Sequence, residues 1–110
     1  MIHIMIAVDT DGNLRSLKAE GHSMSAAKGS NIICAAVSAQ LRSVVRVLQN
    51  GIGLKSLVSA DRDGLLELSV ETEDGENRWL TGVTDVLLAG LIEIERENPR
   101  ECSIKLVKIE

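Results

Sequence analysis

The chain is organised around residues 21–38, which read GHSMSAAKGSNIICAAVS. A stretch of small and polar residues runs here into a strongly apolar segment. Ser30 or Asn31 is a good N-cap for a helix beginning at Ile32, because its side-chain oxygen accepts from N–H groups that have no partner within the helix. Cys34 then lies in the first helical turn, where the positive end of the helix favours a thiolate.

A histidine and a cysteine in one segment indicate a possible nucleophilic site. Cys34 supplies the thiol, and His22 accepts its proton if the preceding loop folds back. Cysteine is also among the most buried residue types, so a lone Cys near the start of an apolar helix is more often a packing residue. The residue pattern alone leaves both interpretations open.

A resemblance to a known family favours the catalytic interpretation. Gly21-His22, a loop containing Gly29, and IICAAVS at residues 32–38 together resemble the signature of the ribosomal-processing cysteine proteases, the Prp family. Members of that family are about this length, and the resemblance covers essentially the whole chain, although only this stretch is specific. It implies that His22 and Cys34 form a catalytic dyad.

Four more residues of this stretch are assigned supporting or substrate-binding positions: Gly21, Gly29, Asn31 and Ser38. The family usually has Asp where Asn31 stands, and an amide caps a helix but lends no negative charge to an imidazolium. Ser38 follows Cys34 by four residues and lies on the same flank of the helix, where its hydroxyl either contacts the sulfur or bonds back to the Cys34 carbonyl.

The resemblance also implies a function. Family members remove a short hydrophobic amino-terminal extension from large-subunit ribosomal protein 27, a step that ribosome assembly requires. The implied activity is that of a cysteine endopeptidase without a cofactor. The alternative is a non-catalytic, ribosome-associated module that binds a peptide in the same groove, and a thiol redox protein is disfavoured because the chain has no C-x-x-C motif.

Length and composition indicate one domain over residues 1–110, since 45% hydrophobic content supports a single modest core. With one Trp and no Phe or Tyr, that core must be aliphatic, and aromatic platforms for stacking nucleic-acid bases are missing. A formal net charge of −4 also argues against direct nucleic-acid binding and suits a basic partner.

No run of the sequence approaches the roughly 18 apolar residues of a membrane span, and Met1–Val8 is too short for a signal peptide. We therefore expect a cytoplasmic protein without a membrane partner, in which Cys34 and Cys102 are free thiols. No metal is expected either, because His3, His22 and the two cysteines show no close pairing of the kind that zinc sites use.

Periodicity predicts the α+β order ββαββαβ, with a mostly antiparallel five-stranded sheet and both helices on one face. Alternating apolar residues predict two hairpins, and helical spacing predicts two helices. The expected elements are strands 2–8 and 14–20, a helix 32–50, strands 54–60 and 65–71, a helix that Asp74-Gly75 opens and that runs through about Glu97, and a strand 102–109.

The second predicted helix is apolar over much of its circumference. Leu80, Leu87 and Leu91 belong to a core stripe, whereas Val86 and Ile92 lie outside it. A helix of this kind needs a second surface to cover it. A homodimer that forms through this helix meets that need, and the family resemblance implies the same assembly.

Overall fold

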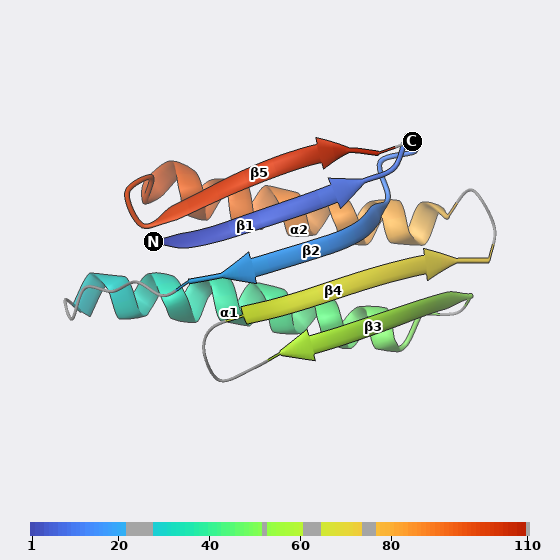
Figure 1. The fold of residues 1–110 in the computed structure, drawn as a ribbon, viewed down its shortest axis with the longest axis horizontal. Helices are drawn as coiled ribbons and strands as arrows, with labels where there is room; N and C mark the ends of the chain where they lie inside the picture. Colours follow the sequence, from blue (N-terminus) through green and yellow to red (C-terminus); the bar gives the residue numbers. More distant parts are fainter. Residues whose placement is uncertain (22–27, 52, 61–64, 74–76, 110) are drawn as a thin grey trace.

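The computed structural model describes residues 1–21, 28–51, 53–60, 65–73 and 77–109, with the backbone alone for residues 28–31. The chain follows the predicted order ββαββαβ (Figure 1). Its elements are β1 (Ile2–Val8), β2 (Leu14–Glu20), α1 (Lys28–Gln49), β3 (Leu54–Ala60), β4 (Leu65–Thr72), α2 (Arg78–Glu97) and β5 (Cys102–Lys108).

The strands form one sheet in the order β3-β4-β2-β1-β5. Neighbouring strands are antiparallel except for β1 and β5, which run parallel. Both helices cover the same face, with α2 behind the β1 and β5 side of the sheet and α1 behind the β3 and β4 side (Figure 1). The predicted α+β class, with a mostly antiparallel sheet and two helices on one face, is therefore confirmed.

The core lies between the sheet and the two helices and is aliphatic, as predicted. Because alternate side chains of a strand point to opposite faces, β1 buries every second residue against the helices. Helices α1 and α2 bury residues at three- and four-residue spacing. The main contributors are Ile2, Ile4, Ile6 and Val8 from β1, Ile33, Val37, Leu41, Val44 and Leu48 from α1, and Leu80, Leu87 and Leu91 from α2.

The start of α1 differs from the prediction. The helix begins at Lys28 and not at Ile32, so Ser30 and Asn31 lie inside its first turn and neither is the N-cap. Ser and Asn are tolerated there because the first-turn N–H groups have no helical partner to lose. Cys34 is consequently in the second turn of α1.

The start of α2 differs as well. The helix begins at Arg78, a few residues after the predicted Asp74-Gly75, and its N-cap is Asn77. The Asn77 side-chain oxygen accepts a 2.9 Å hydrogen bond from the backbone N–H of Leu80, which satisfies one of the first-turn donors. This cap fixes where α2 begins.

Among the residues that the structure describes, one segment meets the length and composition of a membrane span, contrary to the expectation from the sequence. It is Ile32–Gln49 of α1. Core helices of globular domains pass the same test, and α1 buries its apolar stripe, including Val37 and Leu48, against the sheet.

The β1–β2 turn is organised by the carboxylate of Asp9. Its Oδ1 accepts from the backbone N–H groups of Asp11 (2.9 Å) and Asn13 (3.0 Å), and its Oδ2 lies 2.7 Å from Nη2 of Arg15. Burial acts to raise the pKa of Asp9, but the Asn13 and Asp11 N–H donors and the Arg15 guanidinium outweigh it and hold the pKa below its ordinary value. The folded turn therefore favours the ionised form of Asp9.

Two buried polar residues connect this hairpin to α2. The backbone N–H of Leu14 donates a 3.0 Å hydrogen bond to Oγ1 of Thr84, and that hydroxyl donates to the carbonyl of Leu80 at 2.8 Å. The Thr81 hydroxyl donates to Oδ1 of Asn13 at 2.5 Å. Asn13 and Thr84 are fully buried, so these bonds fix the position of α2 on the sheet at the end away from the start of α1.

Candidate active site

Cys34 lines a groove of about 470 Å³ between α1 and one end of the sheet. Its side chain is half-buried, between buried Ile33 and exposed Ala35, as expected for a residue at the edge of the apolar stripe. The α1 side of the groove also includes Ser38 and Arg42. A thiol in this position is reachable from the groove.

The opposite side of the groove is formed where four strands begin or end at the same edge of the sheet (Figure 1). These residues are distant from Cys34 in the sequence and mostly apolar: Ile2 from β1, Gly21 just after β2, Ala60 from β3, and Leu65 and Leu66 from β4. Buried Val37 and Leu41 of α1 also line the groove. The groove is therefore suited to an apolar peptide segment.

Gly21 occupies a position that only glycine fits. Its φ angle is +97°, in the left-handed region that L side chains avoid, and a Cβ atom there would collide with the carbonyl oxygen of Met1. The predicted supporting role of Gly21 thus has a structural basis, because this residue lines the groove and lets the end of β2 pack against the start of the chain.

The structure describes some of the other predicted site residues completely, some by their backbone alone, and one not at all. His22 lies outside the described residues, so the distance between His22 and Cys34 stays open. Gly29 and Asn31 are in the first turn of α1, where the backbone alone is described. Ser38 is half-buried, one turn after Cys34, and lines the same groove.

The corrected start of α1 changes the electrostatic argument for Cys34. The influence of the helix dipole falls off within the first turn, and Cys34 is beyond it. The α-helical pattern also directs the Cys34 N–H toward the carbonyl of Ser30, so it is not one of the unpartnered donors at the helix end. The predicted position of Cys34 in the first helical turn was therefore wrong.

Cys102 is a different kind of thiol. It is fully buried in β5, with none of its surface exposed. Burial raises the pKa of the Cys102 thiol, and the negative charge of Glu95 adds to that effect. Cys102 is thus a packing residue, and Cys34 is the thiol that lines a groove.

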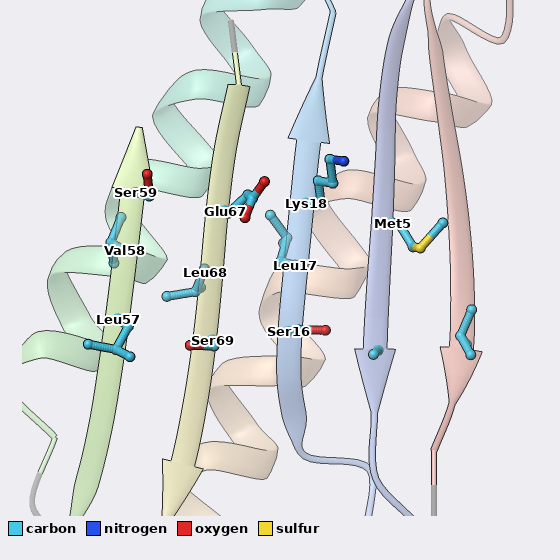
Figure 2. A pocket seen from close by; sticks show the side chains of 12 residues that line it. Met5, Ser16, Leu17, Lys18, Leu57, Val58, Ser59, Glu67, Leu68 and Ser69 are labelled. Atoms are coloured by element: carbon cyan, nitrogen blue, oxygen red, sulfur yellow. The ribbon is translucent and has the colours of Figure 1, made fainter. Parts of the chain in front are cut away.

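A second hollow, of about 580 Å³, lies on the face of the sheet away from the helices (Figure 2). Met5, Lys18, Leu57 and Glu67 are among the side chains that line it, and they come from β1, β2, β3 and β4. It contains serines but neither a cysteine nor a histidine among its described lining residues, so it offers no activated nucleophile. The smaller groove at Cys34 is the better candidate for chemistry.

Metal chemistry finds no support in the described part of the chain. Within those residues, no three His, Cys, Asp or Glu side chains are grouped closely enough to hold a metal ion.

The fold is similar to that of several solved structures. SMU.848 from Streptococcus mutans superimposes with a TM-score of 0.84 at 20% identity, covering 99% of this chain and 96% of that one. The essential ribosomal processing protease Prp from S. aureus, in complex with a covalently linked product peptide, superimposes with a TM-score of 0.81 at 22% identity, covering 96% and 99%. The same S. aureus protease with a substrate peptide gives 0.79 at 21% identity, again covering 96% and 99%.

These identities show a shared fold. No curated protein sequence matches the chain significantly. The profile of the family described as cysteine protease Prp, however, matches residues 1–103. A match over nearly the whole chain shows that this protein belongs to the Prp family of cysteine proteases.

Proposed function

We propose that this cysteine protease is an endopeptidase that uses Cys34 as nucleophile and His22 as general acid and base. The observation that carries the proposal is the contrast between the two thiols: Cys34 faces a groove lined by apolar side chains, whereas Cys102 is buried in the sheet. Membership of a cysteine protease family requires a reactive thiol, and Cys34 is the one that a peptide reaches.

The proposed reaction follows the usual course for a thiol protease. His22 takes the proton from the Cys34 thiol as Sγ bonds to the scissile carbonyl carbon. The tetrahedral intermediate then collapses, the C–N bond breaks, and His22 donates its proton to the leaving amine. Water, deprotonated by His22, hydrolyses the thioester and releases the new carboxyl terminus and free Cys34.

We infer that the substrate is large-subunit ribosomal protein 27 carrying a short apolar amino-terminal extension. The apolar lining of the groove at Leu41, Leu65 and Leu66 suits such an extension. The related S. aureus protein is a ribosomal processing protease that binds a substrate peptide. The net charge of −4 favours a basic partner such as a ribosomal protein over nucleic acid, and ribosome assembly would place the enzyme in the cytoplasm.

We further propose a homodimer that forms through α2. Several large apolar side chains are exposed on the outer surface of the helical layer, including Val86 of α2 at 67% and Trp79 of α2 at 46%. Together with Val47 of α1 they border an apolar groove of about 480 Å³ between the helices. A second copy would cover these side chains. Sedimentation equilibrium of wild type and Val86→Asp tests this, and a wild-type monomer at micromolar concentration would contradict it.

Cleavage of a peptide that spans the extension junction, followed by mass spectrometry, tests the proposed function. Wild-type enzyme should cut once, Cys34→Ala should be inactive, and His22→Ala should lose at least about 10²-fold in kcat/KM while remaining folded. Cys102→Ser controls for general loss of a thiol and should retain cleavage. If Cys34→Ala bound the peptide and cut it at the wild-type rate, the mechanism would be refuted.

A further inference from the structure

Cys34, Ser38 and Arg42 are among the α1 residues that line the groove. They are spaced four positions apart, so each lies about one turn after the one before it, with a rotation of about 40° around the helix at each step. At a rise of about 1.5 Å per residue, Cys34 and Arg42 are about 12 Å apart along the helix axis. The Arg42 side chain therefore leaves the helix about two turns after Cys34.

Arg42 presents a charge to the groove that no described residue neutralises. Its side chain is exposed, and within the described part of the chain it forms neither a salt bridge nor a hydrogen bond. The other charged lining residue, Glu20, has Lys18 4.0 Å from its carboxylate. Between Cys34 and Arg42 the described lining is apolar except for Ser38, so Arg42 is the described cationic group that the groove offers to a ligand.

An extended peptide advances about 3.3 Å per residue. A substrate lying along α1 with its scissile bond at Cys34 therefore places its third or fourth residue from that bond beside Arg42. Arginine has five N–H donors and no acceptor, and it binds carboxylate oxygens more strongly than neutral ones. A side chain ending in an oxygen acceptor is consequently favoured at that position, and a cationic one is disfavoured.

We propose that Arg42 is a specificity-determining residue that selects a carboxylate or amide side chain three or four residues from the scissile bond. This inference rests on the proposed function, because it takes Cys34 as the nucleophile. Arg42 would give the enzyme a preference for a polar substrate side chain three or four residues from the scissile bond, in a groove whose other described lining residues are mainly apolar. The residue binds substrate and takes no part in bond breaking.

The test is a series of junction peptides in which each position from two to five residues away from the scissile bond, on either side, carries Glu, Gln, Leu or Lys in turn. Wild-type enzyme should show the order Glu, Gln, Leu, Lys in kcat/KM at a distance of three or four residues. Because Arg42 is exposed to solvent, the preference for Glu over Leu should be about three- to fivefold and should weaken as salt is raised. Arg42→Gln should abolish the preference for Glu over Leu at that distance, and Arg42→Glu should favour Lys.

Arg46→Gln is the matched control, since Arg46 is also exposed and lies one turn further along α1, outside the groove. It should keep the wild-type preference. The inference is overturned if Arg42→Gln retains the order, or if both variants lose it equally. Failure of wild-type enzyme to cut any peptide would instead refute the proposed function, so the two failures are distinguishable.

Discussion

Gly21 packs so closely against the carbonyl oxygen of Met1 that the structure leaves no space for a Cβ atom between them. The φ angle of Gly21, +97°, adds a second constraint. Gly12 shares the positive φ, at +81°, but a Cβ there would meet nothing within 4 Å. A substitution at Gly12 therefore introduces backbone strain alone, whereas a substitution at Gly21 introduces both backbone strain and a steric collision.

We expect Gly12→Ala to lower the free energy of unfolding by about 1–2 kcal/mol, through backbone strain alone. Gly21→Ala should cost about 1–3 kcal/mol more, because the end of β2 or the start of β1 must also shift. Urea unfolding of both variants measures the difference. Equal losses would show that the contact with Met1 is relieved without cost.

The two thiols should react at different rates. Brief treatment of the native protein with iodoacetamide should label Cys34 first, since Cys34 lines a groove, whereas Cys102 is buried and its pKa is raised. Peptide mapping reports the labelled site. Labelling in urea serves as a control in which both thiols should react, and preferential labelling of native Cys102 would contradict the assignment of the site.

The hydroxyl of Thr84 should contribute measurably to stability. Thr84→Val preserves the shape of the side chain but leaves the buried N–H of Leu14 without its acceptor, which should cost about 1–3 kcal/mol in the free energy of unfolding. Thr84→Ser keeps the hydroxyl and should lose only about 1 kcal/mol through the missing methyl group. If Thr84→Ser were less stable than Thr84→Val, the hydrogen bond to Leu14 would not be the main contribution of Thr84 to stability.

Asp9 should make stability depend on acidic pH. Its pKa is lower in the folded protein than the ordinary 3.8, so its stabilising effect is fully present above that value and is lost as the pH falls through the folded pKa. The free energy of unfolding of wild type should decline on acidification below about pH 4. Asp9→Asn should be less stable at neutral pH and should show a shallower decline, and parallel profiles for the two proteins would exclude Asp9 as a source of the dependence.

Much of the fold was predictable from local sequence patterns. The alternation from Ile2 to Val8 and the helical spacing from Ile33 to Leu48 gave the correct elements, because each pattern places its apolar residues on one face. The start of α1 was missed, since Ser30 and Asn31 suit an N-cap as well as a first turn. Whether Ser30 and Asn31 form the N-cap or the first turn depends on where the helical backbone begins.

The candidate site was predictable only in part. The family signature identified the segment that includes Cys34. Leu65 and Leu66 face Cys34 across the groove through the packing of β4 beside α1, a long-range arrangement that no local pattern encodes. Arg42 had a usable signal, its spacing of eight residues from Cys34 along one helix flank, which sequence reasoning did not pursue.

The parallel pairing of β1 with β5 also bears on when the groove forms during folding. Ile2 lines the groove and is the register partner of Cys102, roughly a hundred residues along the chain. Closing so long a loop has a high entropic cost, whereas the β1–β2 and β3–β4 hairpins close over short loops and form early. We therefore expect β5 to join the sheet late and the edge of the sheet near Ile2 to become rigid only then. A partly folded or nascent chain would possess the Cys34 thiol without a finished substrate groove, and so would be unable to hold a peptide in place for cleavage.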